Sequence, residues 1–342
     1  MATTRKIRIR SPLTGAKRAR FCCGKAFSAR ARLALRFAAQ IALATLLLTS
    51  GAISAAQARA NAWVDYVVLI SIDGLRPDAI IKAPAPNLLR LIDLGVYCAR
   101  TQTVEPIATL PAHTSMLTGL SPAHHGVFFN QYRPGYYQGA TVFSVAKKAG
   151  LTTAMLFAKS KLNYLADPRY LDFIYGEPGV SGFASSGTTA AQLAAVFGQR
   201  WSKHSYNLTF IHMREPDAAG HSRGWMSQAY LDAVMVTDLA VGRIVSAIEH
   251  SQRRARTALI VTADHGGKGH HHQVPGRESS TIPWILVAPG VPEGLRIDRV
   301  LHVYDTTPTA LAVLGLTMPG AIDGVTVPEV LPSSRMSRTP GH

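Results

Sequence analysis

The sequence predicts an α/β protein in which helices cover both faces of a mostly parallel central sheet. Short apolar runs rich in β-branched residues alternate along the chain with longer segments of helical periodicity. The apolar runs are continuous rather than alternating, which is typical of parallel strands that are buried on both faces. Residues 61–332 contain no internal repeat and no Pro/Ser-rich linker, so we expect a single domain there.

Each element is expected from its local pattern. The first strand is the run YVVLISI at 66–72. A helix is expected at 86–95, because apolar residues recur there at helical spacing between a proline and a glycine. Further strands are expected at 152–157, 207–212, 258–262 and 284–288. Further helices are expected at 188–201, 227–250 and 306–314, and another is expected to start within 111–117.

The two ends of the chain are expected to lie outside this domain. Residues 1–36 are basic, 37–56 are largely apolar and small residues recur at 56–60, which together are typical of a secretory signal peptide. The apolar stretch is close to the length that spans a bilayer, so an uncleaved membrane anchor is the alternative. We therefore expect an exported protein, periplasmic or secreted, which contacts a membrane only through this segment. The tail at 333–342 is expected to be disordered.

The positive charge of the chain is concentrated in this leader. The formal net charge is +16, but residues 1–60 carry twelve Lys and Arg and no acidic residue. The rest of the chain carries 24 basic and 20 acidic residues, an excess of only +4. We therefore expect no nucleic-acid-binding domain, since such domains carry a strongly basic face.

Acidic side chains follow three of the expected strands. Asp73 comes directly after the first strand, Asp217 follows a second, and Asp264 and His265 follow a third. In parallel α/β sheets, ligands bind outside the carboxyl ends of the strands. We therefore expect these side chains to converge on one crevice.

The spacing of these residues favours a metal site. Asp217 and His221 are four residues apart and share one face of a helical turn. Two glycines after Asp264 and His265 let the backbone bend so that both side chains reach one centre. A histidine run at 270–272 can add one or two ligands. Taken singly, each feature has a structural alternative: a turn cap, a surface pair or a solvated polar run.

Three carboxylates and three histidines suit zinc, which accepts carboxylate oxygen and imidazole nitrogen as ligands. Two Zn²⁺ ions with three carboxylates would leave a charge of about +1, which suits an anionic phosphodiester. Two metal ions about 3.5–4 Å apart can stabilise both the attacking and the leaving oxygen of an in-line displacement.

Thr109 is the candidate nucleophile. It is placed to cap a helix that has Pro111 in its first turn. Helix N-termini favour negative charge, so an alkoxide or a bound phosphate would be stabilised there. Metal coordination would lower the pKa of the hydroxyl enough for attack. The alternative is that Thr109 only caps the helix.

Together these motifs resemble the type I phosphodiesterase/nucleotide pyrophosphatase branch of the alkaline phosphatase superfamily. The resemblance extends from Val67 to about Leu331 and includes LISIDG, PNLLRLIDLG, EPDAAGH and TADHGG. Its most specific part is TLPAHTSMLTGLSPAHHG, which begins at Thr109. The sequence lacks the C-x-P-S-R motif of sulfatases and has threonine where typical alkaline phosphatases have serine. The resemblance implies an alkaline-phosphatase-like fold.

The resemblance also implies two zinc sites built from carboxylates and histidines. One would use Asp217, His221 and His272, and the other would use Asp73, Thr109, Asp264 and His265. His272 is chosen as the late histidine because of its distance from Asp264 and from the I-P-W strand, with His270 as the reserve choice. Asn130 matches a family asparagine that donates to a phosphate oxygen, the alternative being an ordinary turn residue.

The activity that the resemblance implies is hydrolysis of phosphate esters, either phosphodiesters or nucleotide pyrophosphates. The substrate would be a small phosphate ester or nucleotide, and the reaction would pass through a phospho-threonine intermediate at Thr109. The aromatic loop at 131–139 is either a stacking surface for a leaving group or an ordinary surface loop. The alternatives are a phosphomonoesterase or phosphonate hydrolase, a membrane-anchored phosphoryl or headgroup transferase, and a non-catalytic binding module.

Overall fold

A computed structural model describes the protein at residues 36, 40, 62–176 and 187–331. The expected leader at 1–60, apart from two of its residues, and the expected tail at 333–342 lie outside the described residues. The chain from Gly51 onward is one unit by its internal contacts, and the fold below is that of this unit. Among the described helices, none has both the length and the apolar character needed to cross a bilayer.

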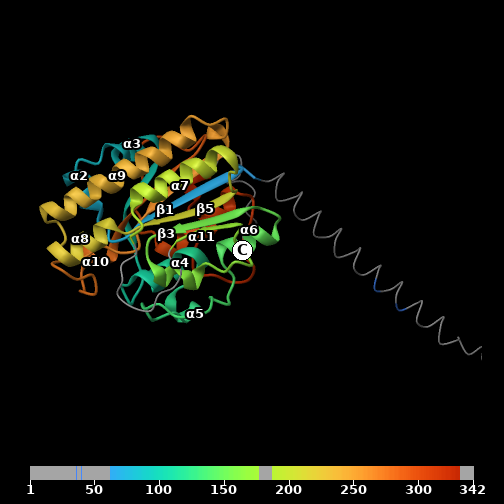
Figure 1. The fold of residues 1–342 in the computed structure, drawn as a ribbon, viewed down its shortest axis with the longest axis horizontal. Helices are drawn as coiled ribbons and strands as arrows, with labels where there is room; N and C mark the ends of the chain where they lie inside the picture. The colour runs from blue at the N-terminus through green and yellow to red at the C-terminus, as the bar shows by residue number, and fades with distance from the viewer. Residues whose placement is uncertain (1–35, 37–39, 41–61, 177–186, 332–342) are drawn as a thin grey trace, which may run out of the picture. The chain divides into compact units, whose positions relative to one another are not determined.

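An eight-stranded sheet forms the centre of the unit, in the order β4-β3-β5-β1-β6-β7-β2-β8 (Figure 1). The strands are β1 Tyr66–Ile72, β2 Val96–Gln102, β3 Thr153–Phe157, β4 Phe173–Tyr175, β5 Leu208–Met213, β6 Thr257–Thr262, β7 Thr281–Val287 and β8 Leu295–Arg296. From β4 to β6 neighbouring strands are parallel, whereas β7 is antiparallel to both β6 and β2. The predicted mostly parallel sheet is confirmed.

Three strands were not expected from the sequence. β2 reads VYCARTQ, and its polar residues interrupt any continuous apolar run. It is nevertheless held between β7 and β8, with an irregularity in its pairing between Cys98 and Thr101. β4 and β8 span only three and two residues, which is too short for a periodicity to be recognised.

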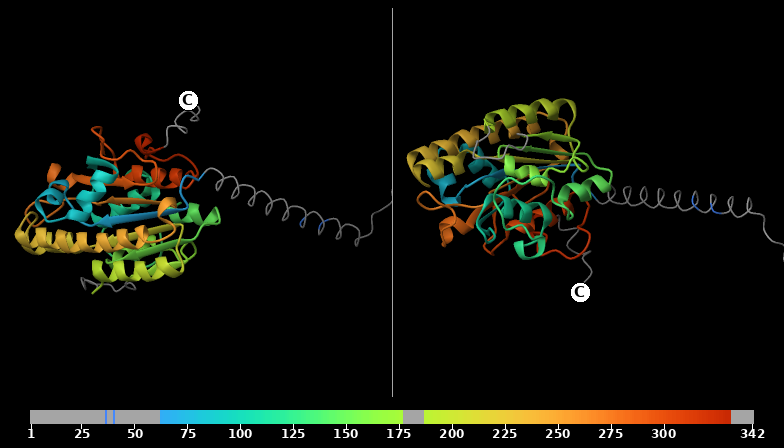
Figure 2. Two further views of the ribbon diagram at one scale, coloured as in Figure 1. Left: turned by 90° about the horizontal axis from the view of Figure 1, so that it is seen from above. Right: turned by 60° about the horizontal axis from the view of Figure 1, so that its bottom comes forward.

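Helices cover both faces of the sheet (Figure 2). One layer consists of α2 (Pro77–Lys82), α3 (Pro86–Leu94), α7 (Ala190–Lys203) and α8 (Glu215–Arg223), all packed against the long helix α9 (Gln228–Glu249). The other consists of α4 (Thr109–Thr118), α5 (Pro122–His125), α6 (Val142–Lys148) and α11 (Thr306–Val313). The short α10 (Arg277–Ser280) precedes β7. The helices expected near 86, 188, 227 and 306 are confirmed.

The central strands are buried along their whole length. Every residue of β5 and β6 is buried, as are six of the seven residues of β1. Because both faces of these strands are covered by helices, apolar side chains are needed at every position rather than at alternate ones. The result is a rigid centre that fixes where β5, β1 and β6 end.

The amino end of α3 is capped by a side chain from another helix. Ala85, at the N-cap of α3, supplies no side-chain cap. Instead the fully buried Asp238 of α9 accepts hydrogen bonds from the Leu88 N–H at 2.7 Å and from the Asn87 side-chain amide at 2.8 Å. The carboxylate also lies at the positive end of the α3 dipole. Asp238 therefore joins two helices of the same layer.

We expect Asp238→Ala to lower the free energy of unfolding by about 2–4 kcal/mol, because it leaves buried donors at the start of α3 without an acceptor. Urea denaturation followed by circular dichroism would measure the loss. The matched control is Asp232→Ala, which removes an exposed carboxylate from the same helix and should change stability by less than about 0.5 kcal/mol. Equal effects of the two substitutions would contradict the capping role.

Candidate active site

Three acidic residues meet at the carboxyl end of the sheet. β5, β1 and β6 are parallel neighbours, so they end at the same edge. Asp73 follows β1, Asp264 follows β6, and Asp217 lies in the first turn of α8, after β5. The Asp217 N–H donates to the Asp73 carbonyl at 3.0 Å, and the Gly74 N–H donates to Asp264 Oδ1 at 3.1 Å. The backbone therefore holds the three residues around one crevice.

Glycines allow this close approach. Gly74 has a φ of +74°, and a Cβ there would lie 2.9 Å from Asp217 Cα. A Cβ at Gly266 would lie 2.1 Å from the carbonyl oxygen of Glu278. Side chains at these positions would push α8 away from β1 and the 264–267 turn away from α10. The glycines that follow Asp73 and His265 are therefore required by the geometry of the crevice.

Three histidines at the crevice share one arrangement of their ring nitrogens. In each ring Nδ1 lies within hydrogen-bond distance of a backbone carbonyl, which can only accept. The pairs are His221 with His270, His265 with Gly266 and His272 with Ile107, at 2.9, 2.9 and 2.7 Å. Nδ1 must therefore carry the hydrogen, and Nε2 of the neutral ring keeps its lone pair. Histidines that bind a metal through Nε2 are held in this way, with the N–H at Nδ1 donating to a backbone carbonyl.

Four buried polar atoms of the crevice lack a hydrogen-bond partner. They are Asp73 Oδ1, Asp217 Oδ1, Asp264 Oδ2 and His265 Nε2. His265 Nε2 lies 3.3 Å from Asp264 Oδ2 and 3.6 Å from Asp73 Oδ1. Buried polar atoms without partners are costly, and a cation is the one partner that carboxylates and a neutral imidazole can share. The donor set present therefore fits a divalent metal such as zinc.

Two groups of potential ligands can be distinguished, each with its ligand atoms within 4.8 Å of one another. They are Asp217, His221 and His272, and Asp73, Asp217 and His265. The first group has the members of one expected zinc site. The second contains Asp217, whereas the expected second site contains Asp264 and Thr109 in addition to Asp73 and His265. Asp217 thus lies between the two groups.

The histidine run contributes one buried side chain. His272 is 8% exposed and its ring stacks on that of His265, with centroids 4.0 Å apart. His270 and His271 are both exposed. The backbone carbonyl of His270, the reserve choice, instead accepts the hydrogen bond from His221 Nδ1.

Thr109 is the first residue of α4 rather than its cap. The helix begins before the expected 111–117 segment, with Ala108 in extended conformation at the N-cap and no side-chain cap. The prediction that Thr109 caps the helix was wrong, because Thr109 is already the first helical residue and Ala108 occupies the N-cap. Thr109 is buried, and its Oγ1 accepts a hydrogen bond from Lys159 Nζ at 3.3 Å. The hydroxyl is therefore held in the crevice instead of serving the helix.

Asn130 lies beside the nucleophile candidate. Its Oδ1 accepts a hydrogen bond from the Leu110 N–H, in the first turn of α4, at 3.0 Å. This contact fixes which end of the amide group faces the helix. The amide NH₂ group is left on the other side, where a bound anion would require a donor.

Sequence reasoning missed two residues of the crevice, Lys159 and His212. Lys159, just after β3, lies with Nζ 2.6 Å from Asp73 Oδ2 and 2.6 Å from Asp217 Oδ2. His212, in β5, donates from Nε2 to Asp73 Oδ2 at 2.8 Å, while its Nδ1 accepts from the Ala158 N–H. Lys159 follows a strand end just as Asp73 does, so the strand-end argument applied to β3 would have found it. His212 lies within an apolar strand, and no spacing marks it.

The charges in the crevice shift several pKa values. Burial raises the pKa of Asp264, and the Asp73 carboxylate raises it further, to about 7. Burial also acts on Asp73, but Lys159 and His212 outweigh it and hold the pKa of Asp73 well below its ordinary range. Without a metal, Asp264 is therefore the carboxylate whose charge is least compensated.

The same crevice also shifts the pKa values of its basic groups. Burial lowers the pKa of Lys159, but Asp217 and Asp73 more than offset this and raise it above its ordinary value. Burial, followed by the charge of His265, lowers the pKa of His272 to about 3. At neutral pH Lys159 is therefore a cation and His272 a neutral imidazole, which is the form that binds a metal.

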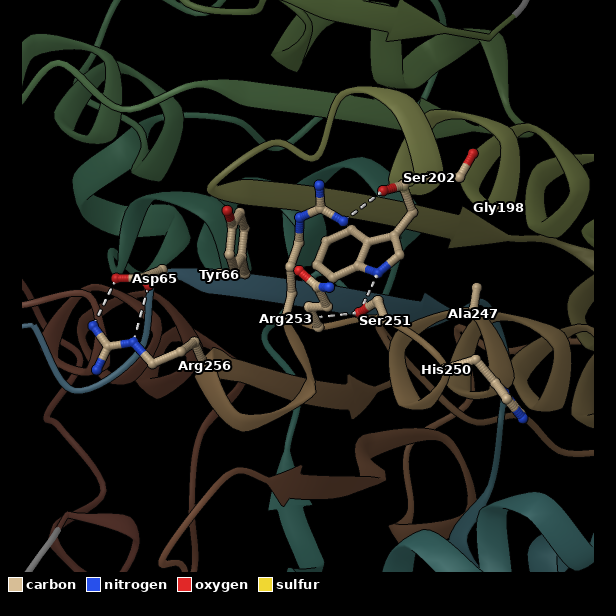
Figure 3. Close-up of a pocket in the computed structure, with 11 residues that line it drawn as sticks. Asp65, Tyr66, Gly198, Ser202, Ala247, His250, Ser251, Arg253 and Arg256 are labelled. Atoms are coloured by element: carbon tan, nitrogen blue, oxygen red, sulfur yellow. Dashed lines mark hydrogen bonds and ion pairs between the residues drawn. The ribbon is translucent and has the colours of Figure 1, made fainter.

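A hollow of about 730 Å³ lies at the opposite end of β1 (Figure 3). It is lined by the start of β1 and by the carboxyl-terminal parts of α7 and α9, and by none of the potential metal ligands. Arg256 pairs with Asp65 at 2.7 Å, and Arg253 donates to the Trp201 carbonyl at 3.2 Å. We therefore place the chemistry at the carboxyl end of the sheet.

Comparison with known proteins finds the family that the sequence motifs resemble. Residues 67–279 match the family model of type I phosphodiesterase/nucleotide pyrophosphatase. Ectonucleotide pyrophosphatase/phosphodiesterase family member 3 of Rattus norvegicus is 25% identical over 222 residues, which cover 58% of this chain and 24% of that protein. Bis(5'-adenosyl)-triphosphatase enpp4 of Xenopus laevis is 23% identical over 222 residues, covering 60% and 48%. The chain spans about a quarter to a half of these relatives.

Solved structures share the fold. Murine ectonucleotide pyrophosphatase/phosphodiesterase 5 superposes with a TM-score of 0.63 and 14% identity, covering 75% of this chain and 97% of that one. The phosphonate monoester hydrolase of Agrobacterium radiobacter gives a TM-score of 0.60 with 16% identity, covering 78% and 77%. The predicted alkaline-phosphatase-like fold is confirmed.

We expect zinc to raise the melting temperature of chelator-treated protein by about 5–10 °C at a hundredfold excess over its dissociation constant, because it supplies the missing partner of the buried ligand atoms. Differential scanning fluorimetry would measure the shift. Asp217→Asn should abolish most of it, whereas Asp232→Asn, the same change at an exposed position, should preserve it. An unshifted wild-type protein would show that the crevice does not bind zinc.

Proposed function

Since the chain belongs to the type I phosphodiesterase/nucleotide pyrophosphatase family, we propose that it is an exported two-zinc hydrolase of phosphate esters. Its substrates would be phosphodiesters or nucleotide pyrophosphates. The observation that carries the proposal is a buried crevice in which unpaired ligand atoms lie beside a threonine hydroxyl that does not cap its helix. Export is supported by the basic and apolar composition of residues 1–60.

The ligands of the two zinc ions would be those expected from the sequence. One ion would be held by Asp217, His221 and His272, and the other by Asp73, Asp264, His265 and Thr109. Bound zinc would supply positive charge that lowers the pKa of a hydroxyl group and neutralises a phosphate. His212 would keep Asp73 oriented, since its Nε2–H donates to Oδ2 of Asp73. The other oxygen, Oδ1, has no partner and would be the metal ligand.

The reaction would use Thr109 as nucleophile. After the hydroxyl loses its proton, Oγ1 attacks phosphorus, and the bond from phosphorus to the leaving-group oxygen breaks as the Oγ1–P bond forms. Water then attacks the phosphorus of the phospho-threonine ester, and the phosphomonoester, which keeps its second ester group, departs as the Oγ1–P bond breaks. Oγ1 regains a proton from the attacking water, and the proton lost in the first step ends on the leaving-group oxygen. The Leu110 N–H is already bonded to Asn130 Oδ1, so the Asn130 NH₂ group is the donor that would stabilise a non-bridging oxygen.

A nucleotide is the favoured substrate class. A structure of murine ectonucleotide pyrophosphatase/phosphodiesterase 5 is of an inactive threonine-to-alanine variant in complex with AMP. In this chain the aromatic loop at 131–139 directly follows Asn130, and the Tyr137 N–H bonds to the Tyr164 carbonyl at 2.7 Å. The loop is thereby fixed next to the proposed phosphate position, where its rings could stack on a nucleoside.

We expect Thr109→Ala to lower kcat/KM by at least about 10³-fold, because no other hydroxyl replaces the attacking Oγ1. Thr109→Ser restores a hydroxyl and should recover activity to within about 10²-fold of the wild type. Mass spectrometry of acid-quenched reactions should find a phosphoryl group on the peptide that contains Thr109. Full activity of zinc-loaded Thr109→Ala would refute the mechanism.

A substrate panel with a common leaving group tests the reaction class. We expect kcat/KM to be higher for the p-nitrophenyl ester of thymidine 5'-phosphate than for p-nitrophenyl phenylphosphonate, because a nucleoside can contact the aromatic loop. The ratio of the two kcat/KM values should be about tenfold, which corresponds to the free energy of roughly one stacking contact. A preference for the phosphonate would instead identify a phosphonate hydrolase. Failure to cleave any member of the panel would favour a transferase or a binding module.

A further inference from the structure

Lys159 is the charged residue of the crevice that the proposed mechanism does not use. It directly precedes the short helix Ser160–Leu165 that follows β3, and its side chain is only 18% exposed. Its Nζ contacts Asp73 Oδ2 and Asp217 Oδ2, each at 2.6 Å, and donates to Thr109 Oγ1 at 3.3 Å. A cation is thus built into the crevice at the proposed nucleophile.

The contacts of Lys159 leave the metal-binding atoms available. In both Asp73 and Asp217 the ammonium is bonded to Oδ2, whereas Oδ1 is the atom without a partner. Lysine and metal would therefore use different oxygens of the same carboxylates. The ammonium can keep its place at Thr109 when the Oδ1 atoms bind metal ions.

This cation changes the charge of the proposed site. Two Zn²⁺ ions and three carboxylates give about +1, and Lys159 raises the total to about +2. A phosphodiester carries one negative charge, whereas a phosphomonoester carries two above its second pKa of about 6. The additional charge therefore complements a dianionic phosphoryl group. Within a buried crevice such a contact is worth more than it would be in water.

We propose that Lys159 is a specificity-determining residue that contacts the phosphoryl group under attack and extends the substrate range to dianionic groups. The chemistry recognised is an unesterified, dianionic phosphoryl head, as in a phosphomonoester. The inference rests on the proposed function and refines its substrate class. In it, Thr109 and the metal ligands provide the reaction, and Lys159 sets the balance between dianions and monoanions.

The test compares wild type with Lys159→Met, a neutral side chain of similar length. Both enzymes are assayed at pH 8 and at equal measured zinc content on p-nitrophenyl phosphate, a dianion, and on the p-nitrophenyl ester of thymidine 5'-phosphate, a monoanion. We expect the ratio of kcat/KM for the dianion to that for the monoanion to fall about tenfold or more in Lys159→Met. Lys159→Arg keeps the charge and should retain most of the ratio. An unchanged ratio in Lys159→Met would overturn the proposal.

Lys161 provides the matched control. It lies in the same turn, but the ion pairs with Asp73 and Asp217 are made by Lys159. Lys161→Met should leave the ratio within about twofold of the wild type, because it leaves the contacts of Lys159 in place. Burial and the charge of Lys159 lower the pKa of Lys161 to about 8, so the substitution removes part of a nearby positive charge at pH 8. An equal effect of both substitutions would show that a diffuse field, not contact by Lys159, sets the preference, and would overturn the proposal.

A binding measurement on the wild type remains decisive even if Lys159→Met does not fold. Calorimetry with the zinc-loaded enzyme should show that inorganic phosphate and methylphosphonate, both dianions at pH 8, bind about tenfold or more tightly than dimethyl phosphate. Equal affinities would overturn the role of Lys159 while leaving the proposed diesterase intact. Absence of zinc binding or of any hydrolysis would overturn the proposed function together with this inference.

Discussion

Mutual repulsion of three buried carboxylates is the constraint on which the site depends. Asp73, Asp217 and Asp264 are held together by β5, β1 and β6, whose parallel pairing and covered faces prevent them from separating. Lys159 compensates part of the charge, but three carboxylate oxygens and one imidazole nitrogen remain without a partner. A fold that buries such a cluster would gain stability from a cation that binds it, so metal binding would be coupled to folding.

Most of the fold follows from simple patterns. β1, β5 and β6 are continuous apolar runs, and the sheet covered on both faces explains why. β2 could not be predicted in this way. Its short apolar run is followed by Arg100, Thr101 and Gln102, and it is a strand because β7 and β8 hold it on either side. Its structure depends on tertiary pairing that local composition does not encode.

The convergence of Asp73, Asp217 and Asp264 was expected because each follows a strand of a mostly parallel sheet, and ligands bind outside the carboxyl ends of such strands. The position of Thr109 within α4 did not, since a helix N-terminus is uncertain by one or two residues from sequence. Lys159 was overlooked for a different reason. Nothing in its local sequence distinguishes a lysine whose charge is buried against carboxylates from one on the surface, and only the neighbouring strand ends reveal its partners.

Three histidines of the crevice are oriented by carbonyl groups of the main chain rather than by other side chains. They are His221, His265 and His272. The orientation of each ring therefore depends on the path of the backbone. A substitution at Ile107 or His270 keeps the carbonyl that accepts the bond from His272 or His221. The positions of the catalytic groups can therefore stay constant while the surrounding surface changes. Related proteins can acquire new substrates in this way and still keep the same catalytic centre.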